Sequence, residues 1–265
     1  MNKIRIAAFD VDGTLFDEKK KEFPQSAIDS LKQLNHNGIM VALVTGRPPL
    51  SARAIESYGV SIDAFVCCNG HLVFDGQGNI IMDRRFDGEL AQQVWEYCQK
   101  HEIGLMWKYP DKTKVYTDHP EFQNIFARNR NNSSFSVTYG QTDYHWQESP
   151  SNGVLACDLN KLEEFNREFE GKCIAVDING QSSDLLLYGV TKQVGFRELL
   201  NHYDILPQQC IAFGDNNNDA EIISYAGTGV CMGNGAQALK DIADYVTTDI
   251  DDDGIRNALK HFGLI

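Results

Sequence analysis

Along the first 70 residues, short apolar runs alternate with stretches in which apolar residues recur at helical spacing. Apolar runs over residues 4–9, 39–44 and 64–68 predict three buried strands, because each run is short, carries β-branched side chains and ends in a polar turn. Apolar residues three and four positions apart predict a helix before Gly38 and another over residues 50–58. Strands joined by single helices pair in parallel, so this rhythm predicts a doubly wound α/β sheet.

The alternation of predicted strands and helices stops after residue 70 and resumes near residue 190. Asp75-Gly76, between two short apolar runs, predicts a hairpin. Residues 85–188 mix helical and alternating segments around a polar Asn/Ser run at 129–134, whereas strands and helices alternate again from residue 196 onward. We therefore predict a Rossmann-like three-layer core with a parallel sheet, formed by residues 1–84 and 189–265, and an inserted α+β domain at 85–188.

Polar turns follow four of the predicted strands. In an open α/β sheet, ligands bind beyond the carboxyl ends of the strands, so these turns are expected to lie at one edge. A single Asp-x-Asp-Gly is as well explained by a solvated turn, but its repeated strand–turn context favours a site. The turns are Asp10-Val11-Asp12-Gly13-Thr14-Leu15, Thr45-Gly46-Arg47-Pro48, Asn69-Gly70 and Gly214-Asp215-Asn216-Asn217-Asn218-Asp219.

The residue types in these turns suit the handling of a phosphate group. Four carboxylates without Cys or His beside them are hard oxygen donors, which suit Mg²⁺; they are Asp10, Asp12, Asp215 and Asp219. The Thr45 hydroxyl and the backbone N–H groups around Gly13 and Gly46 can donate hydrogen bonds to phosphoryl oxygens. Lys192, just ahead of a predicted helix, is the candidate for a fixed cation.

These motifs resemble those of the haloacid dehalogenase superfamily. The turn at Asp10 resembles its first motif, Thr45-Gly46-Arg47 the second, Lys192 the third and Gly214–Asp219 the fourth, and their order spans the whole chain. Cys67-Cys68-Asn69-Gly70 and Met232-Gly233-Asn234-Gly235 are similar to motifs of its Cof-type branch. In that branch an α+β cap domain of type IIB is inserted between the second and third motifs, which is where the predicted insertion lies.

The resemblance implies a mechanism and a set of site residues. Asp10 would attack phosphorus and form an aspartyl-phosphate, and Asp12 would protonate the leaving alcohol and then activate water. Mg²⁺ would be held by Asp10, the backbone carbonyl of Asp12, Asp215 and Asp219, with Asn218 as an alternative to the last. Thr45 and Lys192 would stabilise the transferring phosphoryl group. The expected substrate contacts are Gly13, Gly46, Arg47, Asn69, Asn218 and, in the cap, Asp184.

Net charge, cysteine content and the N-terminal segment limit the classes of binding partner and the cellular compartment that we expect. The 265 residues carry a net charge of −13, which argues against nucleic acid and against an acidic membrane surface. An anionic substrate therefore needs a local positive pocket, which Mg²⁺, Lys192 and Arg47 would supply. The seven cysteines include no CxxC pair, so we expect buried free thiols. The apolar stretch near the N-terminus is too short for a signal peptide, which favours a cytoplasmic protein.

Three functions fit these residues. The first is a Mg²⁺-dependent phosphatase of small phosphate monoesters, such as sugar phosphates or related metabolites, acting as a monomer or weak homodimer. A sugar phosphomutase would use the same residues but return the phosphoryl group to the sugar. A non-catalytic metabolite-binding protein is disfavoured by the intact set of Asp10, Asp12, Lys192 and Asp215.

Overall fold

The computed structural model describes residues 3–129 and 137–265, so most of the predicted Asn/Ser run lies outside the described residues. The chain divides into two compact units. The first, here called the core unit, comprises Met1–Arg47, Ala52–Asp83 and Thr191–Ile265. The second, here called the inserted unit, comprises Pro48–Ser51 and Arg84–Val190.

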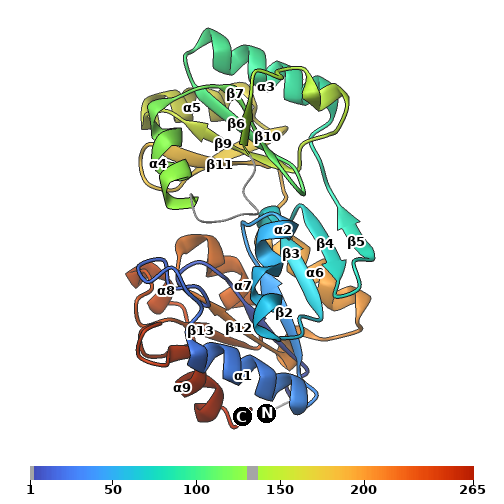
Figure 1. Ribbon diagram of the computed structural model, residues 1–265, viewed down its shortest axis with the longest axis vertical. Helices are drawn as coiled ribbons and strands as arrows, with labels where there is room; N and C mark the ends of the chain where they lie inside the picture. The colour runs from blue at the N-terminus through green and yellow to red at the C-terminus, as the bar shows by residue number, and fades with distance from the viewer. Residues whose placement is uncertain (1–2, 130–136) are drawn as a thin grey trace. The chain divides into compact units, whose positions relative to one another are not determined.

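Within the described residues, the core unit contains an eight-stranded sheet in the order β14-β13-β12-β1-β2-β3-β4-β5 (Figure 1). Neighbouring strands from β14 to β3 pair in parallel, whereas β4 and β5 form the predicted antiparallel hairpin. The strands are β1 (Ile6–Phe9), β2 (Met40–Val44), β3 (Ala64–Cys67), β4 (Leu72–Asp75), β5 (Ile80–Asp83), β12 (Cys210–Gly214), β13 (Thr228–Cys231) and β14 (Tyr245–Val246).

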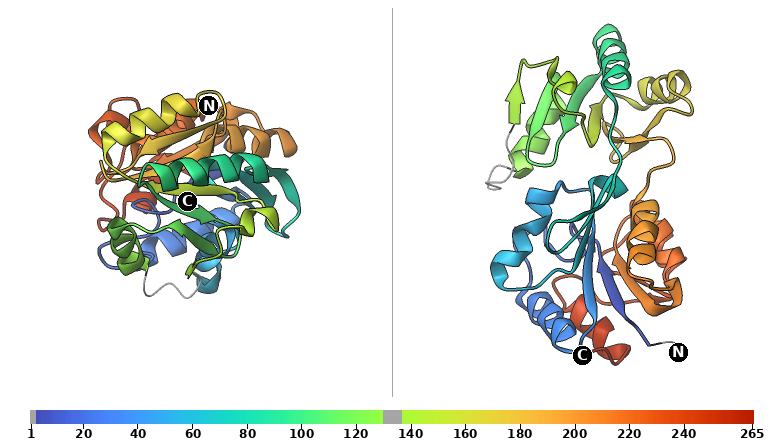
Figure 2. Two further views of the ribbon diagram at one scale, coloured as in Figure 1. Left: turned by 90° about the horizontal axis from the view of Figure 1, so that it is seen from above. Right: turned by 90° about the vertical axis from the view of Figure 1, so that its right-hand side faces the viewer.

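Helices cover both faces of this sheet, as a three-layer fold requires. Alternate side chains of β1 belong to different cores: Phe9 packs in the cluster that includes the apolar faces of α1 and α9, and Ile6 in the cluster that includes those of α6 and α7. Figure 2 shows these helix pairs on opposite sides of the sheet. The helices are α1 (Gln25–His36), α6 (Lys192–His202), α7 (Ala220–Tyr225) and α9 (Gly254–His261), and a short α8 (Gln237–Lys240) precedes β14.

The helix predicted over residues 50–58 is regular only in part. An α-helical turn, α2 (Pro49–Ala52), continues as the 3₁₀ helix η1 (Arg53–Tyr58). Gly59, with φ of 75°, ends it in the left-handed conformation that favours glycine, as the sequence indicates.

The inserted unit has the predicted α+β character. Its sheet has the strand order β10-β11-β9-β6-β7-β8 among the described residues, and only the β7–β8 pair is parallel. β8 escaped prediction because it has three residues and two of them are exposed, which leaves no alternating pattern. The elements are α3 (Gly88–Lys100), β6 (Gly104–Lys108), β7 (Thr113–Thr117), α4 (Pro120–Asn129), β8 (Val137–Tyr139), β9 (Asn152–Ala156), α5 (Leu159–Glu168), β10 (Cys173–Asp177) and β11 (Ser182–Leu187).

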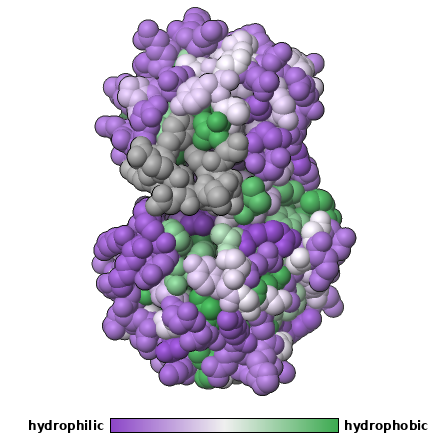
Figure 3. All heavy atoms as spheres, in the orientation of Figure 1, coloured by the Kyte–Doolittle hydropathy of each residue, from purple (hydrophilic) through white to green (hydrophobic). Residues whose placement is uncertain are grey.

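Further features are the character of the surface, the state of the cysteines and the length of the apolar helices. Hydrophilic side chains dominate the face of each unit visible in Figure 3. All seven cysteines are free and buried. Across the described residues, no helix is both long enough and apolar enough to span a bilayer.

Candidate active site

The carboxyl ends of three neighbouring parallel strands position the candidate residues. β12, β1 and β2 are in register, so that Phe9 pairs with Phe213 on one side and with Leu43 on the other. Asp10 follows β1 directly, Asp215 follows β12 and Thr45 follows β2. Because parallel strands end at the same edge, residues 200 positions apart in the sequence meet there.

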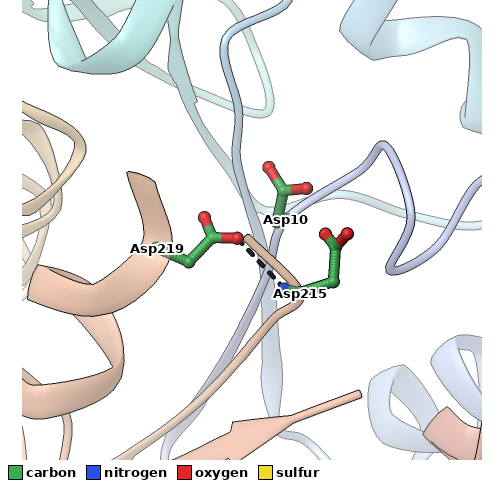
Figure 4. Close-up of side chains that lie close together, drawn as sticks. All are labelled: Asp10, Asp215 and Asp219. Carbon is green, nitrogen blue, oxygen red and sulfur yellow. Dashed lines mark hydrogen bonds between the residues drawn. The ribbon is translucent and has the colours of Figure 1, made fainter. Parts of the chain in front are cut away.

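Three carboxylates form the centre of the site. One oxygen from each of Asp10, Asp215 and Asp219 lies within 4.8 Å of the others. Figure 4 shows Asp10 and Asp215 beside Asp219, which lies on the helical segment that follows the turn after β12. The backbone N–H groups of Asp215 and Asn216 donate to Asp219 Oδ2 at 3.1 and 3.2 Å. Thr14 Oγ1 donates to Asp215 Oδ1 at 3.1 Å. These hydrogen bonds fix the orientation of two of the three carboxylates.

Lys192 places its ammonium group against this cluster. Its Nζ lies 2.7 Å from both Asp10 Oδ1 and Asp219 Oδ1, and the side chain is buried. It is the first residue of α6, where the Thr191 side chain accepts a hydrogen bond from the Val194 N–H. Burial alone would lower the pKa of Lys192, but the charges of Asp10 and Asp219 outweigh it and raise that pKa. Lys192 is therefore a permanent cation.

The electrostatics of the carboxylates fit a divalent cation. Burial, with the neighbouring carboxylates, raises the pKa of Asp10 although Lys192 opposes the shift. Burial and the charge of Asp219 raise the pKa of Asp215 to about 7. Three carboxylates against one ammonium leave two negative charges when all are ionised, and an all-oxygen donor set suits a hard cation such as Mg²⁺.

Asp12 and Arg47 form a separate ion pair beside the cluster. Arg47 Nε donates to Asp12 Oδ2 at 2.8 Å and Arg47 Nη2 donates to Asp12 Oδ1 at 2.5 Å, which is a bidentate arrangement. The guanidinium also lies 4.8 Å from the centroid of the Phe16 ring. Burial would lower the pKa of Arg47, but its bond to Asp12 reverses the effect and raises it. The Asp12 side chain is 43 % exposed and accessible to a reactant.

Backbone and hydroxyl groups complete the edge of the site. Thr45 is buried, and its Oγ1 accepts the Arg47 N–H at 3.1 Å. Gly13 adopts φ of 82°, and a Cβ there would lie 2.2 Å from Asp215 Oδ2, so glycine is required on two grounds. A Cβ at Gly46 would lie 3.1 Å from Oδ1 of the buried Asn69.

Two residues that sequence analysis left without a role support these groups. Thr14 orients Asp215, and Asn234 Nδ2 donates to the Gly13 carbonyl at 2.8 Å. Both lie inside motifs quoted for the resemblance, so the motifs themselves were the available signal. Their roles were missed because each acts on a residue about 200 positions away.

Two further expected substrate contacts belong to other elements. Asn218 is exposed within the 3₁₀ helix η5 (Asn217–Asp219). Asp184 lies within β11 of the inserted unit, where its Oδ1 is 3.3 Å from Lys108 Nζ. Of the aromatic residues beside Lys108, Trp107 and Tyr109 are fully buried in the core of that unit.

Comparison with known proteins adds an independent line of evidence. The family described as haloacid dehalogenase-like hydrolase matches residues 7–259. The chain is 30% identical to YkrA of Bacillus subtilis, a protein named provisionally as a phosphatase, over 98% of both chains. It is 27% identical to an HMP-PP phosphatase of Yersinia pseudotuberculosis, over 89% of this chain and 86% of that one. A solved structure of a subclass IIB sugar phosphatase, BT4131, matches with a TM-score of 0.85 and 25% identity, over 98% of this chain and 100% of that one.

Proposed function

The chain belongs to the family of haloacid dehalogenase-like hydrolases and is a phosphatase, and we propose that it hydrolyses small phosphate monoesters through an aspartyl-phosphate on Asp10. The observation that carries this proposal is the pairing of buried Asp10 with Lys192 inside a cluster of three carboxylates. A purely structural ion pair does not need two further carboxylates at the same point, since they repel one another.

In the first step, a carboxylate oxygen of Asp10 attacks phosphorus, and the bond from phosphorus to the ester oxygen breaks. Asp12 gives a proton to the departing alkoxide oxygen, which requires its ion pair with Arg47 to loosen, because both carboxylate oxygens of Asp12 accept hydrogen bonds from the guanidinium. In the second step, Asp12, now a carboxylate, takes a proton from water, which attacks phosphorus and releases Asp10.

The remaining residues hold charge and position. Lys192 neutralises negative charge on the phosphoryl oxygens in this proposal, and its hydrogen bond to Asp10 supports that role. The Thr45 hydroxyl and the backbone N–H groups near Gly13 and Gly46 are suited to donate to the same oxygens. Asp10, Asp215, Asp219 and the Asp12 carbonyl would hold Mg²⁺, which supplies Lewis-acid stabilisation of the developing charge.

The substrate is proposed to be a small phosphorylated metabolite. The subclass IIB relative is named as a sugar phosphatase, and the HMP-PP phosphatases are named for a different phosphorylated compound. Both classes belong in the first substrate panel. Arg47 and Lys192 are the cations near the cluster that would attract such anions to a protein of net charge −13.

Replacement of the nucleophile tests the proposal. We expect Asp10→Asn to lower phosphate release from a panel of sugar phosphates by about 10³-fold or more, because an amide cannot attack phosphorus. The same change at exposed Asp29 on α1 is the matched control and should leave turnover unchanged. Equal activity of Asp10→Asn and wild type would remove Asp10 from the mechanism, and formation of an isomeric sugar phosphate in place of free phosphate would indicate a mutase.

A further inference from the structure

A turn next to the candidate site has an unusual backbone. Between β3 and β4, three consecutive residues have positive φ: Cys68 at 54°, Asn69 at 55° and Gly70 at 96°. All three are buried. Asn tolerates the left-handed region better than most residues, but Cys does not, and two adjacent non-glycine residues in this region are uncommon. Such a conformation persists only when its surroundings hold it in place.

One side of the turn binds the loop that follows β2. The Cys68 N–H donates to the Arg47 carbonyl, and the Asn69 N–H donates to the Thr45 carbonyl, both at 3.0 Å. The left-handed conformation directs these successive N–H groups toward the same loop, as in the backbone nests that bind anions. Thr45 and Arg47 are thereby held through their main chain, and their side chains stay available to the site.

The other side of the turn touches the start of α6. A Cβ on Gly70 would lie 2.0 Å from the Thr191 carbonyl oxygen and 3.2 Å from the Lys192 nitrogen, so the two backbones are in direct contact. A Cβ on Gly195, one turn further along α6, would lie 2.8 Å from Gly70 Cα. The turn therefore supports the residue whose ammonium group binds Asp10 and Asp219.

We propose that Cys68–Gly70 is a positioning turn that sets the Thr45–Arg47 loop against Lys192, and that the left-handed backbone at Cys68 is the feature on which this positioning depends. This inference rests on the proposed phosphatase function. Through Arg47 the turn reaches Asp12, and through Lys192 it reaches Asp10. Both partners of the reaction, the nucleophile and the acid–base group, then depend on one backbone conformation. The side chain of Cys68 is fully buried in the core beneath the turn.

The neighbouring cysteine supplies a matched control. Cys67 is also fully buried in the same core, but its φ of −107° and ψ of 166° are extended. A valine at either position adds similar bulk to the core. Only at residue 68 does valine also disfavour the native backbone conformation, because its β-branched side chain avoids the left-handed region and favours the extended one.

The experiment compares Cys68→Val, Cys67→Val and Cys68→Gly with the wild-type full chain, using para-nitrophenyl phosphate with Mg²⁺ well below the melting temperature of each variant. We expect Cys68→Val to lower kcat by about 30-fold or more with a KM change of less than about 3-fold, because small misplacements of reacting groups are costly. Cys67→Val and Cys68→Gly should stay within about 3-fold of wild type, the latter because glycine keeps the left-handed turn. Wild-type kcat in Cys68→Val, or an equal loss in Cys67→Val, would overturn the proposal.

A second pair of variants covers the case in which Cys68→Val does not fold. Asn69→Ala and Asn69→Gly both lack the side-chain amide and differ in their access to positive φ. The glycine variant should have the higher kcat by about 10-fold, and equal values would contradict a positioning role.

Amide hydrogen exchange separates this inference from the phosphatase proposal. The Cys68 and Asn69 amides should be protected in wild type and Cys67→Val but exposed in Cys68→Val, whether or not the protein turns over an ester. Absence of phosphate release by wild type would contradict the proposed function alone. Protected amides in Cys68→Val would contradict the positioning turn alone.

Discussion

Asp219 is the residue on which the acid cluster depends. Its fully buried carboxylate accepts two backbone N–H groups from the Asp215 turn and also the Lys192 ammonium. Removing the Asp219 carboxylate would leave the buried ammonium group of Lys192 with one carboxylate partner in place of two. It would also leave two backbone N–H groups without an acceptor. For Asp215, burial and the charge of Asp219 raise the pKa to about 7, and Thr14 and Lys192 oppose this shift only in part. The two carboxylates therefore differ in role although both face the same point.

Magnesium affinity should depend on pH because of Asp215. Below pH 7 this carboxyl is mostly protonated in the metal-free protein, and a bound cation must displace that proton. We expect Mg²⁺ to bind more tightly at pH 8 than at pH 6, with proton release that is largest near pH 6. Isothermal titration calorimetry in two buffers of different ionisation enthalpy measures both quantities.

Asp215→Asn provides the comparison for this measurement. The amide should bind Mg²⁺ more weakly at either pH, and the proton release should fall because the group that titrates is gone. Identical proton release by Asp215→Asn and wild type would assign the titration to another carboxylate.

At the scale of single elements, the sequence predicted the core well and the site in part. Apolar runs such as residues 39–44 indicate strands whatever their partners, and parallel pairing then brings Asp10, Thr45 and Asp215 to one edge. The pairing of Arg47 with Asp12 could not be read from spacing, because it depends on the direction of two side chains from different loops. The left-handed backbone of Cys68 could not be predicted from the sequence, because glycine is the residue that usually indicates a left-handed position.

The first turn of α6 connects helix stability with the site. The Thr191 hydroxyl caps this helix by accepting the Val194 N–H, at 3.4 Å, and Lys192 is the next residue. Thr191→Ala should lower the free energy of unfolding by about 1 kcal/mol, the usual contribution of such a cap. It should also lower kcat, because the lysine then extends from a frayed turn.

Thr191→Ser is the control for this prediction, because serine restores the cap oxygen. Urea unfolding and phosphate release, measured on the same samples, test both consequences. Full turnover by a destabilised Thr191→Ala would show that the cap supports the helix without affecting Lys192.

Among the described residues, each of the two units has its own apolar cores. Two buried clusters draw only on residues of the core unit, on the two faces of its sheet, and two others draw only on residues 86–187. We propose from this that residues 1–84 with 189–265, and residues 85–188, behave as distinct domains and unfold in separable transitions. Each unit also contains a buried group with a shifted pKa. The pKa of Asp215 in the core unit is raised, and the pKa of His145 in the inserted unit is lowered.

In the metal-free protein, acid should therefore shift the two units in opposite directions. The raised pKa of Asp215, about 7 against an unfolded value near 3.8, adds stability to the core unit that is present at low pH and lost as pH rises through 7. Burial lowers the pKa of His145 in the inserted unit below 6.5, so the stability from that group is present above 6.5 and lost as pH falls. Calorimetry at pH 7.5 and 5.5 should show the core transition moving up and the other moving down on acidification. Asp215→Asn should weaken the first response, to which Asp10 with its raised pKa also contributes, and His145→Gln should weaken the second. A common downward shift of both transitions in wild type would contradict separate control of the two units by these groups.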